Sequence, residues 1–251
     1  IASDVGRYST NNFTSASLLT TQVFGSSYVN VDVTTQEGVD HAASLNLVGS
    51  GVPDILVSPL FEEVVNRLYS RSHPTKMMVT LRHPVQRAIA NYYYMRTATW
   101  DPQFDPSLAS MTLEQYALSG QMENNYVTRL LTGKFRGTLN RNDLAYAKEI
   151  LRKKALVGLY EDLNGAMDHF ERYFGWAPAT SDALNCQARI LEAGLQKVQF
   201  TPLDEGATAY TLIQHQLQFD LSLYNYAKNQ LIPYQHEAVR RQSQQFENVI
   251  S

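Results

Sequence analysis

The sequence has 251 residues, of which 44% are hydrophobic and 18% charged, so it is long and apolar enough to bury one sizeable core. Its formal net charge of -3 argues against a broadly basic nucleic-acid-binding surface, although a few arginines can still converge on a local anion site. No apolar run approaches the ~20 residues that a membrane-spanning helix needs.

The cysteine content and the glycosylation signal say little about the compartment. The one cysteine, Cys186, cannot form an internal disulfide and is expected at a buried or half-buried, small hydrophobic position. The triplet Asn12-Phe13-Thr14 is a sequon and mildly favours a secretory route.

Short apolar or alternating runs predict the strands. Residues 1–27 are rich in Ser, Thr and Asn and are expected to be irregular, or to form the tail of an element that begins upstream. After them, strands are predicted at 28–33, 54–57, 76–81 and 155–160. The run 76–81, KMMVTL, is typical of a buried strand in a parallel sheet.

Capping residues and helical periodicity predict the helices between these strands. In chain order they are a helix at 37–47, one with Ser58 as N-cap and Pro59 as its first residue, one from Pro84 to about Thr97, one opened by the capping box Thr112–Gln115, one at about 122–131, one capped by Asn142, and one from Leu163 that ends at Gly175.

Strands alternate with helices as far as Phe174, and helical patterns dominate afterwards. This order predicts an α/β fold with a parallel central sheet flanked by helices. We expect a single domain with an irregular segment at 1–27, an α/β core at 28–176 and a mostly helical extension at 177–251.

The most informative stretch surrounds Arg82. A buried strand ends at Leu81, so Arg82 is expected at the carboxyl edge of the sheet, where open α/β folds bind ligands. Pro84 begins a helix whose first amides have no internal partner and whose N-terminus carries a partial positive charge. This arrangement suits a phosphate or sulfate. The alternative is that Arg82 pairs with a carboxylate and merely closes the strand–helix corner.

Four segments, in order, carry a resemblance to a known family. The stretch from Leu81 to Ala90, LRHPVQRAIA, resembles the 3′-phosphate-binding motif Arg-x-Pro-x-x-Arg-x-x-Ser of sulfotransferases of the Golgi carbohydrate type. The other three segments are similar to further parts of that family and lie at Asn125–Gly133, Val157–Glu161 and Asp220–Ala227. The resemblance spans about residues 50 to 232 and implies a P-loop nucleotide-binding-like sulfotransferase fold.

The resemblance implies roles for three residues. Arg82 would hold the 3′-phosphate of the co-substrate 3′-phosphoadenosine 5′-phosphosulfate, and Arg87 would brace the corner. The family serine falls on Ala90, which cannot donate a hydrogen bond, and a bond to a charged group is worth about 1.5–3 kcal/mol. Asn91 points about 100° away from Ala90 on an ideal helix, so it is a poor substitute.

The loop that grips the 5′-phosphosulfate in this family, Pro-Lys-[Ser/Thr]-Gly-[Ser/Thr]-[Ser/Thr], is missing from residues 1–251. We expect it before Ile1, so that the sheet here lacks its first central strand and residues 1–251 alone transfer no sulfate. The alternative is a degenerate relative that has lost catalysis.

The catalytic base is not identified by the sequence. In the family it is a Glu or His near the first helices, so His41, Glu62 and Glu63 are candidates. Glu62 and Glu63 point in different directions on a helix. The alternative is a base that lies upstream of Ile1. The six histidines show no metal-ligand spacing and no Walker motif occurs, so no metal is expected.

The resemblance therefore implies a sulfotransferase that moves a sulfuryl group to a hydroxyl of a carbohydrate or similar acceptor. It also implies a Golgi-lumenal glycoprotein, anchored in the membrane by an upstream segment. The alternatives are a catalytically inactive binding module and, less favoured, a P-loop phosphotransferase relative.

Overall fold

The computed structural model describes residues 15–23, 26–99, 101, 104–176, 178, 180–196 and 203–250. The fold is mixed α/β and mostly helical, with 58% of the residues in helices. Contacts divide the chain into two compact units, the first formed by Ile1–Lys76 with Arg129–Gly137 and the second by Met77–Thr128 with Thr138–Ser251. The prediction of a single domain stays a prediction.

The first unit contains a small hairpin and two helices. Strands β1 (Thr20–Val23) and β2 (Ser26–Val29) pair antiparallel, and helices α2 (Gln36–Ser44) and α3 (Phe61–Leu68) follow. Their core contains five buried side chains, which are Val33, Val39, Ala42, Leu47 and Val64.

Two strand predictions in this unit are wrong. The expectation for 1–27 is tested only in part, because residues 1–14, 24 and 25, with the sequon at Asn12, lie outside the described residues, while β1 lies within the segment. The strand expected at 28–33 ends at Val29 and pairs antiparallel with the preceding β1. Beyond it, the Asp32 carboxylate accepts the Thr34 backbone N–H at 2.9 Å and the chain turns. The alternation of apolar and polar residues still predicts burial, because Val33 packs in the core although it is not part of a strand.

The strand expected at 54–57 is absent. Ile55 and Val57 are 53% and 74% exposed, and only Leu56 packs against the core of the first unit. A short apolar run does not become a strand where no neighbouring strand pairs with it.

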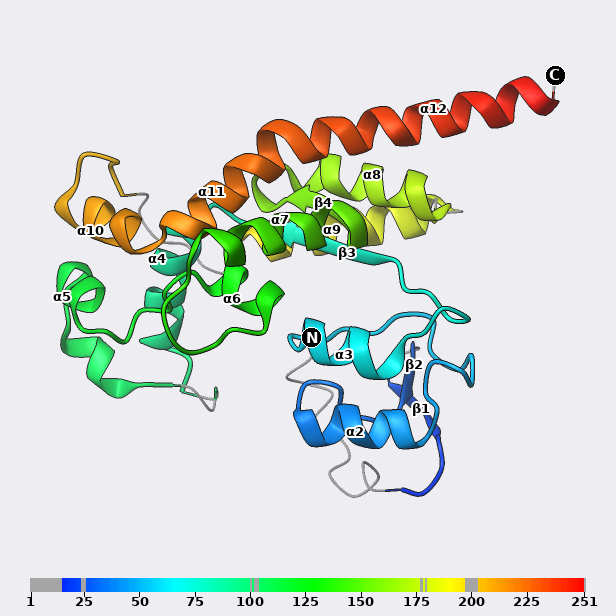
Figure 1. Cartoon of the computed structure of the whole chain (residues 1–251), viewed down its shortest axis with the longest axis horizontal. Coiled ribbons are helices and arrows are strands. Elements are labelled where there is room, and N and C mark those ends of the chain that lie inside the picture. Colours follow the sequence, from blue (N-terminus) through cyan, green and yellow to red (C-terminus); the bar gives the residue numbers. More distant parts are fainter. Residues whose placement is uncertain are drawn as a thin grey trace. The chain divides into compact units, whose positions relative to one another are not determined.

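The second unit is built on two parallel strands in direct register. Strand β3 (Met77–Leu81) pairs with β4 (Ala155–Leu159), so that Leu81 lies opposite Leu159. Helices α7 (Arg141–Lys154), α8 (Leu163–Phe174) and α12 (Ile232–Ile250) contact β4 (Figure 1). This is a two-stranded sheet, so the larger central parallel sheet that we expected is not observed among the described residues.

The two edges of this sheet differ. On β4, the Gln235 side chain accepts the Val157 N–H at 2.9 Å and donates to the Ala155 carbonyl at 2.7 Å, so it replaces a third strand. On β3, Met78 and Thr80 are exposed, so this strand is less buried than its apolar sequence predicted. Among the described residues, the one strand that pairs with β3 is β4.

Most predicted helices are confirmed, with different ends. Helix α4 (Pro84–Met95) starts at Pro84, α5 (Leu113–Leu118) has the Thr112–Gln115 capping box, and α8 ends at Gly175 with φ of 71°. Three expected helix starts are wrong. The N-cap of α3 is Leu60 rather than Ser58, and the N-cap of α7 is Asn140 rather than Asn142. Helix α6 (Tyr126–Thr132) begins four residues after the expected start at about residue 122.

The C-terminal part is helical as predicted. It comprises α9 (Ser181–Gln196), α10 (Thr208–Gln216), α11 (Gln218–Tyr226), the π-helical segment η3 (Ala227–Leu231) and α12. Helices α4, α5 and α10 share the largest core cluster, which includes Ile89, Tyr92, Tyr116 and Ile213. Cys186 is exposed on α9, which corrects the expectation of a buried position.

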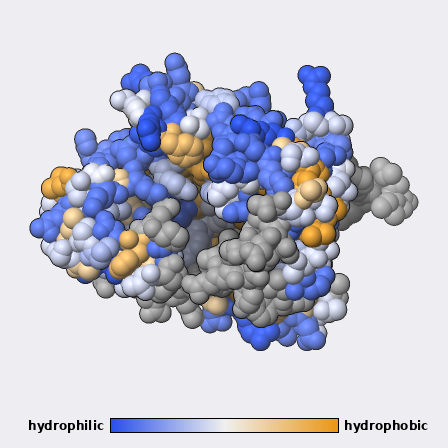
Figure 2. All heavy atoms as spheres, turned by 90° about the horizontal axis from the view of Figure 1, so that it is seen from below, coloured by the Kyte–Doolittle hydropathy of each residue, from blue (hydrophilic) through white to orange (hydrophobic). Residues whose placement is uncertain are grey.

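The molecular surface is predominantly hydrophilic on the face drawn in Figure 2, where hydrophobic residues form small separate groups. Of the helices in the described ranges, none combines the length and the apolar content that crossing a bilayer requires.

Gln235 provides a test of how β4 is held. Replacement Gln235→Leu leaves a buried N–H and a buried carbonyl of β4 unpaired, so we expect the free energy of unfolding to fall by about 2–4 kcal/mol. The exposed neighbour Tyr234, changed to Leu, should alter it by less than about 0.5 kcal/mol. Urea denaturation of both variants measures the difference, and equal stabilities would mean that Gln235 does not seal the edge.

Candidate functional site

The carboxyl edge of the two parallel strands brings two neighbouring side chains together. Because Leu81 and Leu159 are register partners, Arg82 and Tyr160 leave the sheet side by side. The Arg82 guanidinium carbon lies over the Tyr160 ring, 4.7 Å from its centroid, and Arg82 is half-buried. The predicted position of Arg82 at this edge is confirmed.

A carboxylate lies at the N-terminus of α4. His83 is the N-cap, its side chain makes no cap hydrogen bond, and Pro84 follows without an N–H. The His83 backbone N–H donates to Glu161 Oε1 at 2.7 Å. Glu161 therefore lies where a helix N-terminus favours negative charge. The corner holds an arginine beside a helix start, as an anion site requires. It also holds the Glu161 carboxylate, as the alternative interpretation of Arg82 requires.

Tyr224 of α11 completes this corner. Its hydroxyl donates to Glu161 Oε2 at 3.0 Å, and its ring meets the His83 ring edge-on at 5.2 Å. Burial, and secondarily Glu161, raises the pKa of Tyr224, so this phenol stays protonated and remains a donor. Burial lowers the pKa of His83 despite the nearby Glu161, and His83 Nδ1 is buried without a hydrogen-bond partner among the described residues.

Arg87 occupies the position of a brace. Its guanidinium pairs with Glu123 at 2.8 Å and lies 4.6 Å from the centroid of the Tyr126 ring. Glu123 precedes α6 and Tyr126 begins it, so Arg87 connects α4 to the start of α6.

Ala90 lies one helical turn after Arg87 on α4 and is 6% exposed. Burial raises the pKa of the Tyr116 phenol, and the neighbouring Asn91 side chain acts in the opposite direction. Asn91 therefore lies close to Tyr116 of α5.

Two segments far apart in sequence cap each other's helices. Asp220 accepts hydrogen bonds from the backbone of Val127 and Thr128 at 3.1 and 2.8 Å, and from Thr128 Oγ1 at 2.7 Å. In return, Asn125 Oδ1 accepts the backbone N–H groups of Phe219 and Asp220 at 2.9 and 3.0 Å. Asn125 has a positive φ of 50°, a conformation that Asn tolerates better than most residues.

Burial raises the pKa of the Asp220 carboxyl, while its hydrogen bonds from Thr128 and Val127 act in the opposite direction. Asp220 is 2% exposed and Thr128 is fully buried, so these hydrogen bonds must replace the ones that both side chains would make with water.

Residues of all four segments that carry the sequence resemblance are linked in the second unit. Arg82 and His83 meet Tyr160 and Glu161, and Tyr224 of the fourth segment joins Glu161. Arg87 reaches Tyr126 of the second segment, whose Thr128 binds Asp220 of the fourth. The sequence assigned no role to Glu161 or Tyr224, because their contacts join segments that are 63 to 78 positions apart.

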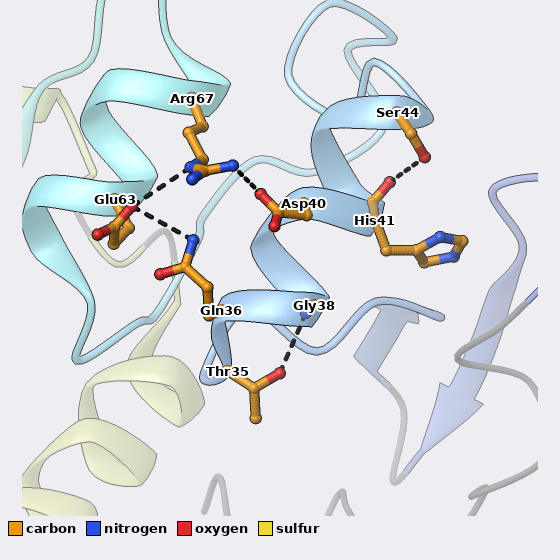
Figure 3. Close-up of polar contacts among 8 residues, drawn as sticks. All are labelled: Thr35, Gln36, Gly38, Asp40, His41, Ser44, Glu63 and Arg67. Atoms are coloured by element: carbon orange, nitrogen blue, oxygen red, sulfur yellow. Dashed lines mark hydrogen bonds and ion pairs between the residues drawn. The ribbon is translucent and has the colours of Figure 1, made fainter.

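The three candidates for the catalytic base lie in the first unit. Glu63 accepts hydrogen bonds from Gln36 and Arg67, both at 3.3 Å, and Arg67 also pairs with Asp40 (Figure 3). His41 belongs to α2 with its ring turned away from Glu63, as Figure 3 shows. Glu62 lies against Gly133, where a Cβ would clash with its carboxylate. Glu63 therefore supports the packing of α2 and α3, and none of the three is tied to a partner that would mark it as a base.

No metal centre is assembled in the described ranges, where no group of three or more His, Cys, Asp or Glu side chains has suitable geometry. The nearest arrangement is a stacked pair, His169 and His236, with ring centroids 4.0 Å apart. Burial, together with His236 and Arg172, lowers the pKa of His169 to about 4, so its ring is neutral at ordinary pH.

Comparisons with known proteins return no match: no family model, curated protein or solved structure is similar to the chain at a significant level. The interpretation of the site therefore depends on its residues alone.

The mutual capping of α6 and α11 is testable by a pair of substitutions. Asp220→Ala leaves three donors unpaired, and we expect it to reduce the free energy of unfolding by about 3 kcal/mol. Thr128→Val removes only the hydroxyl donor and should cost about 1 kcal/mol.

The double variant measures whether the two residues act through each other. Because the Thr128 hydroxyl donates to Asp220, the costs should be less than additive by roughly 0.5–1 kcal/mol in urea denaturation. Strict additivity would contradict the network.

Proposed function

We propose that this chain carries the 3′-phosphate-binding part of a sulfotransferase that uses 3′-phosphoadenosine 5′-phosphosulfate. The single observation that carries the proposal is Arg82 at the carboxyl end of β3, next to the start of α4. A guanidinium and a helix N-terminus together favour a bound phosphate.

In the proposed reaction, a hydroxyl oxygen of the acceptor attacks sulfur as the bond from sulfur to the 5′-phosphate oxygen breaks. The hydroxyl proton goes to a general base, and adenosine 3′,5′-bisphosphate leaves. Arg82 would hold the 3′-phosphate, and Arg87 and Ala90 would line or support that end of the nucleotide. The acceptor in this proposal is a carbohydrate or a similar hydroxyl compound, and the setting is the Golgi lumen.

The exposed side chains of β3 support the proposal of an incomplete sheet. Parallel strands are usually covered on both faces and paired on both sides, whereas Met78 and Thr80 are exposed and β3 has one strand neighbour among the described residues. A strand that leads into the loop for the 5′-phosphosulfate would pair with this edge.

A second candidate function is a sulfotransferase-like binding module without catalysis. The observation that favours it is Glu161, whose carboxylate accepts the His83 N–H where a phosphate would bind. Ala90 in place of the family serine also favours this function, because alanine offers no hydrogen-bond donor to the phosphate. Both features weaken the binding of the phosphosulfate donor, without which no transfer takes place.

The nucleotide site is tested by Arg82→Ala in the full-length chain. Loss of a charge-assisted bond should cost about 1.5–3 kcal/mol of binding, which is roughly a ten- to hundredfold loss of affinity. Calorimetric titration should show this loss for adenosine 3′,5′-bisphosphate and a much smaller one for adenosine 5′-monophosphate, which lacks the 3′-phosphate. Ala90→Ser should tighten the bisphosphate selectively.

Arg152→Ala is the matched control, because Arg152 is an exposed arginine of α7 that pairs with Glu149. It should leave both affinities unchanged. If Arg82→Ala weakens both nucleotides equally, Arg82 acts as a structural brace and the proposed site is wrong.

A further inference from the structure

A polar groove of about 490 Å³ runs along α11 in the second unit, away from the buried Tyr224. Five of its lining residues carry side-chain amides, and these are Gln214, Gln218, Asn225, Asn229 and Gln230. All five are exposed, while Tyr226 and Leu221 form half-buried parts of the lining.

Three of the five amides follow one face of a continuous helical path from α11 into η3. Gln218, Asn225 and Asn229 are separated by seven and four residues, the spacing that returns to the same side of a helix. From Gln218 to Gln230 the path rises roughly 18 Å. The groove can therefore contact an extended chain of several units rather than one small molecule.

A π-helical turn forms the end of this path. The segment Ala227–Leu231 widens the helix between α11 and α12, with Ala227 and Leu231 buried and Asn229 and Gln230 directed to the groove. Such wide turns are rare and occur frequently at functional sites. This observation is independent of the composition of the lining.

The chemistry of the lining favours a ligand rich in hydroxyl groups. Each amide both donates and accepts hydrogen bonds, as sugar hydroxyls do. No carboxylate lines the groove, and its one cation, Lys148, lies 5.3 Å from the centroid of the Tyr226 ring. The Asn225 and Asn229 side chains make no hydrogen bond within the described part of the chain, so their amides are available to a ligand.

Peptide recognition fits this lining less well. Peptide grooves gain affinity from apolar pockets or from a free strand edge, and here the apolar lining is limited to Leu221 and part of Tyr226.

We propose that the groove binds a neutral oligosaccharide. The groove shares no lining residue with the proposed nucleotide site, because Arg82, Glu161 and Tyr224 are not part of its lining.

The test is binding of chitohexaose and maltohexaose to the full-length chain without nucleotide, measured by saturation-transfer difference NMR. The double variant Asn225→Ala/Asn229→Ala should weaken binding at least tenfold. The control Asn66→Ala/Asn142→Ala removes two exposed amides outside the groove and should bind like the wild type. Thermal denaturation must show the same midpoint for both variants, and Gln218→Ala provides a second substitution in the groove if the first pair alters folding.

Wild-type binding of either hexasaccharide, lost in the groove variants and kept in the control, supports the proposal. Absence of binding to both sugars overturns it, and so does binding that the groove variants leave intact. Displacement of the sugar by an uncharged hexapeptide of Ser and Asn would assign the groove to a peptide and also overturn it. Affinity for adenosine 3′,5′-bisphosphate should be the same in all these variants, so failure here is distinguishable from failure of the proposed function.

Discussion

The two hydrogen bonds of the Glu161 carboxylate join three elements at the carboxyl edge of the sheet. One oxygen accepts the first amide of the β3–α4 corner, and the other accepts the hydroxyl of Tyr224 on α11. Because Glu161 is the second residue after β4, the register of β3 and β4 fixes where this carboxylate can reach. Arg82, over Tyr160, takes its position from the same register. The site is thus a consequence of parallel pairing plus one negative charge at a helix start.

The rest of the second unit is stabilised by polar side chains that replace backbone partners. Asp220 and Asn125 satisfy the first amides of each other's helices, and Gln235 satisfies an N–H and a carbonyl of β4. Each of these side chains is at most 9% exposed, so an unpaired bond there would carry the full cost of lost hydration. A two-stranded sheet is marginal by itself. Polar side chains on the helices supply hydrogen bonds that additional strands would otherwise provide, as Gln235 of α12 does for β4.

Sequence reasoning was most successful where a local rule decides the structure. Pro84 at a helix start, the Thr112 capping box and Gly175 at a helix end depend on a few adjacent residues, and all three are confirmed. It failed at 28–33 and 54–57, because whether an apolar run becomes a strand depends on a partner that the run does not encode. In the site, Arg82 followed from the order of strand and helix. The Glu161 contact and the mutual capping of Asn125 and Asp220 could not be derived, because they join segments 78 to 95 positions apart.

The central claim is that the start of α4 is an anion position at which the Glu161 carboxylate and the proposed 3′-phosphate compete. Calorimetric titration of adenosine 3′,5′-bisphosphate against Glu161→Gln tests it most directly. Glutamine can accept the His83 N–H with its oxygen and donate from its nitrogen to the Tyr224 hydroxyl oxygen, and it removes the charge. The account therefore predicts affinity about five- to tenfold tighter than wild type, roughly 1–1.4 kcal/mol. Asp162→Asn removes an equal charge at the N-cap of α8 and should change affinity much less. Unchanged or weaker binding in Glu161→Gln would contradict the account.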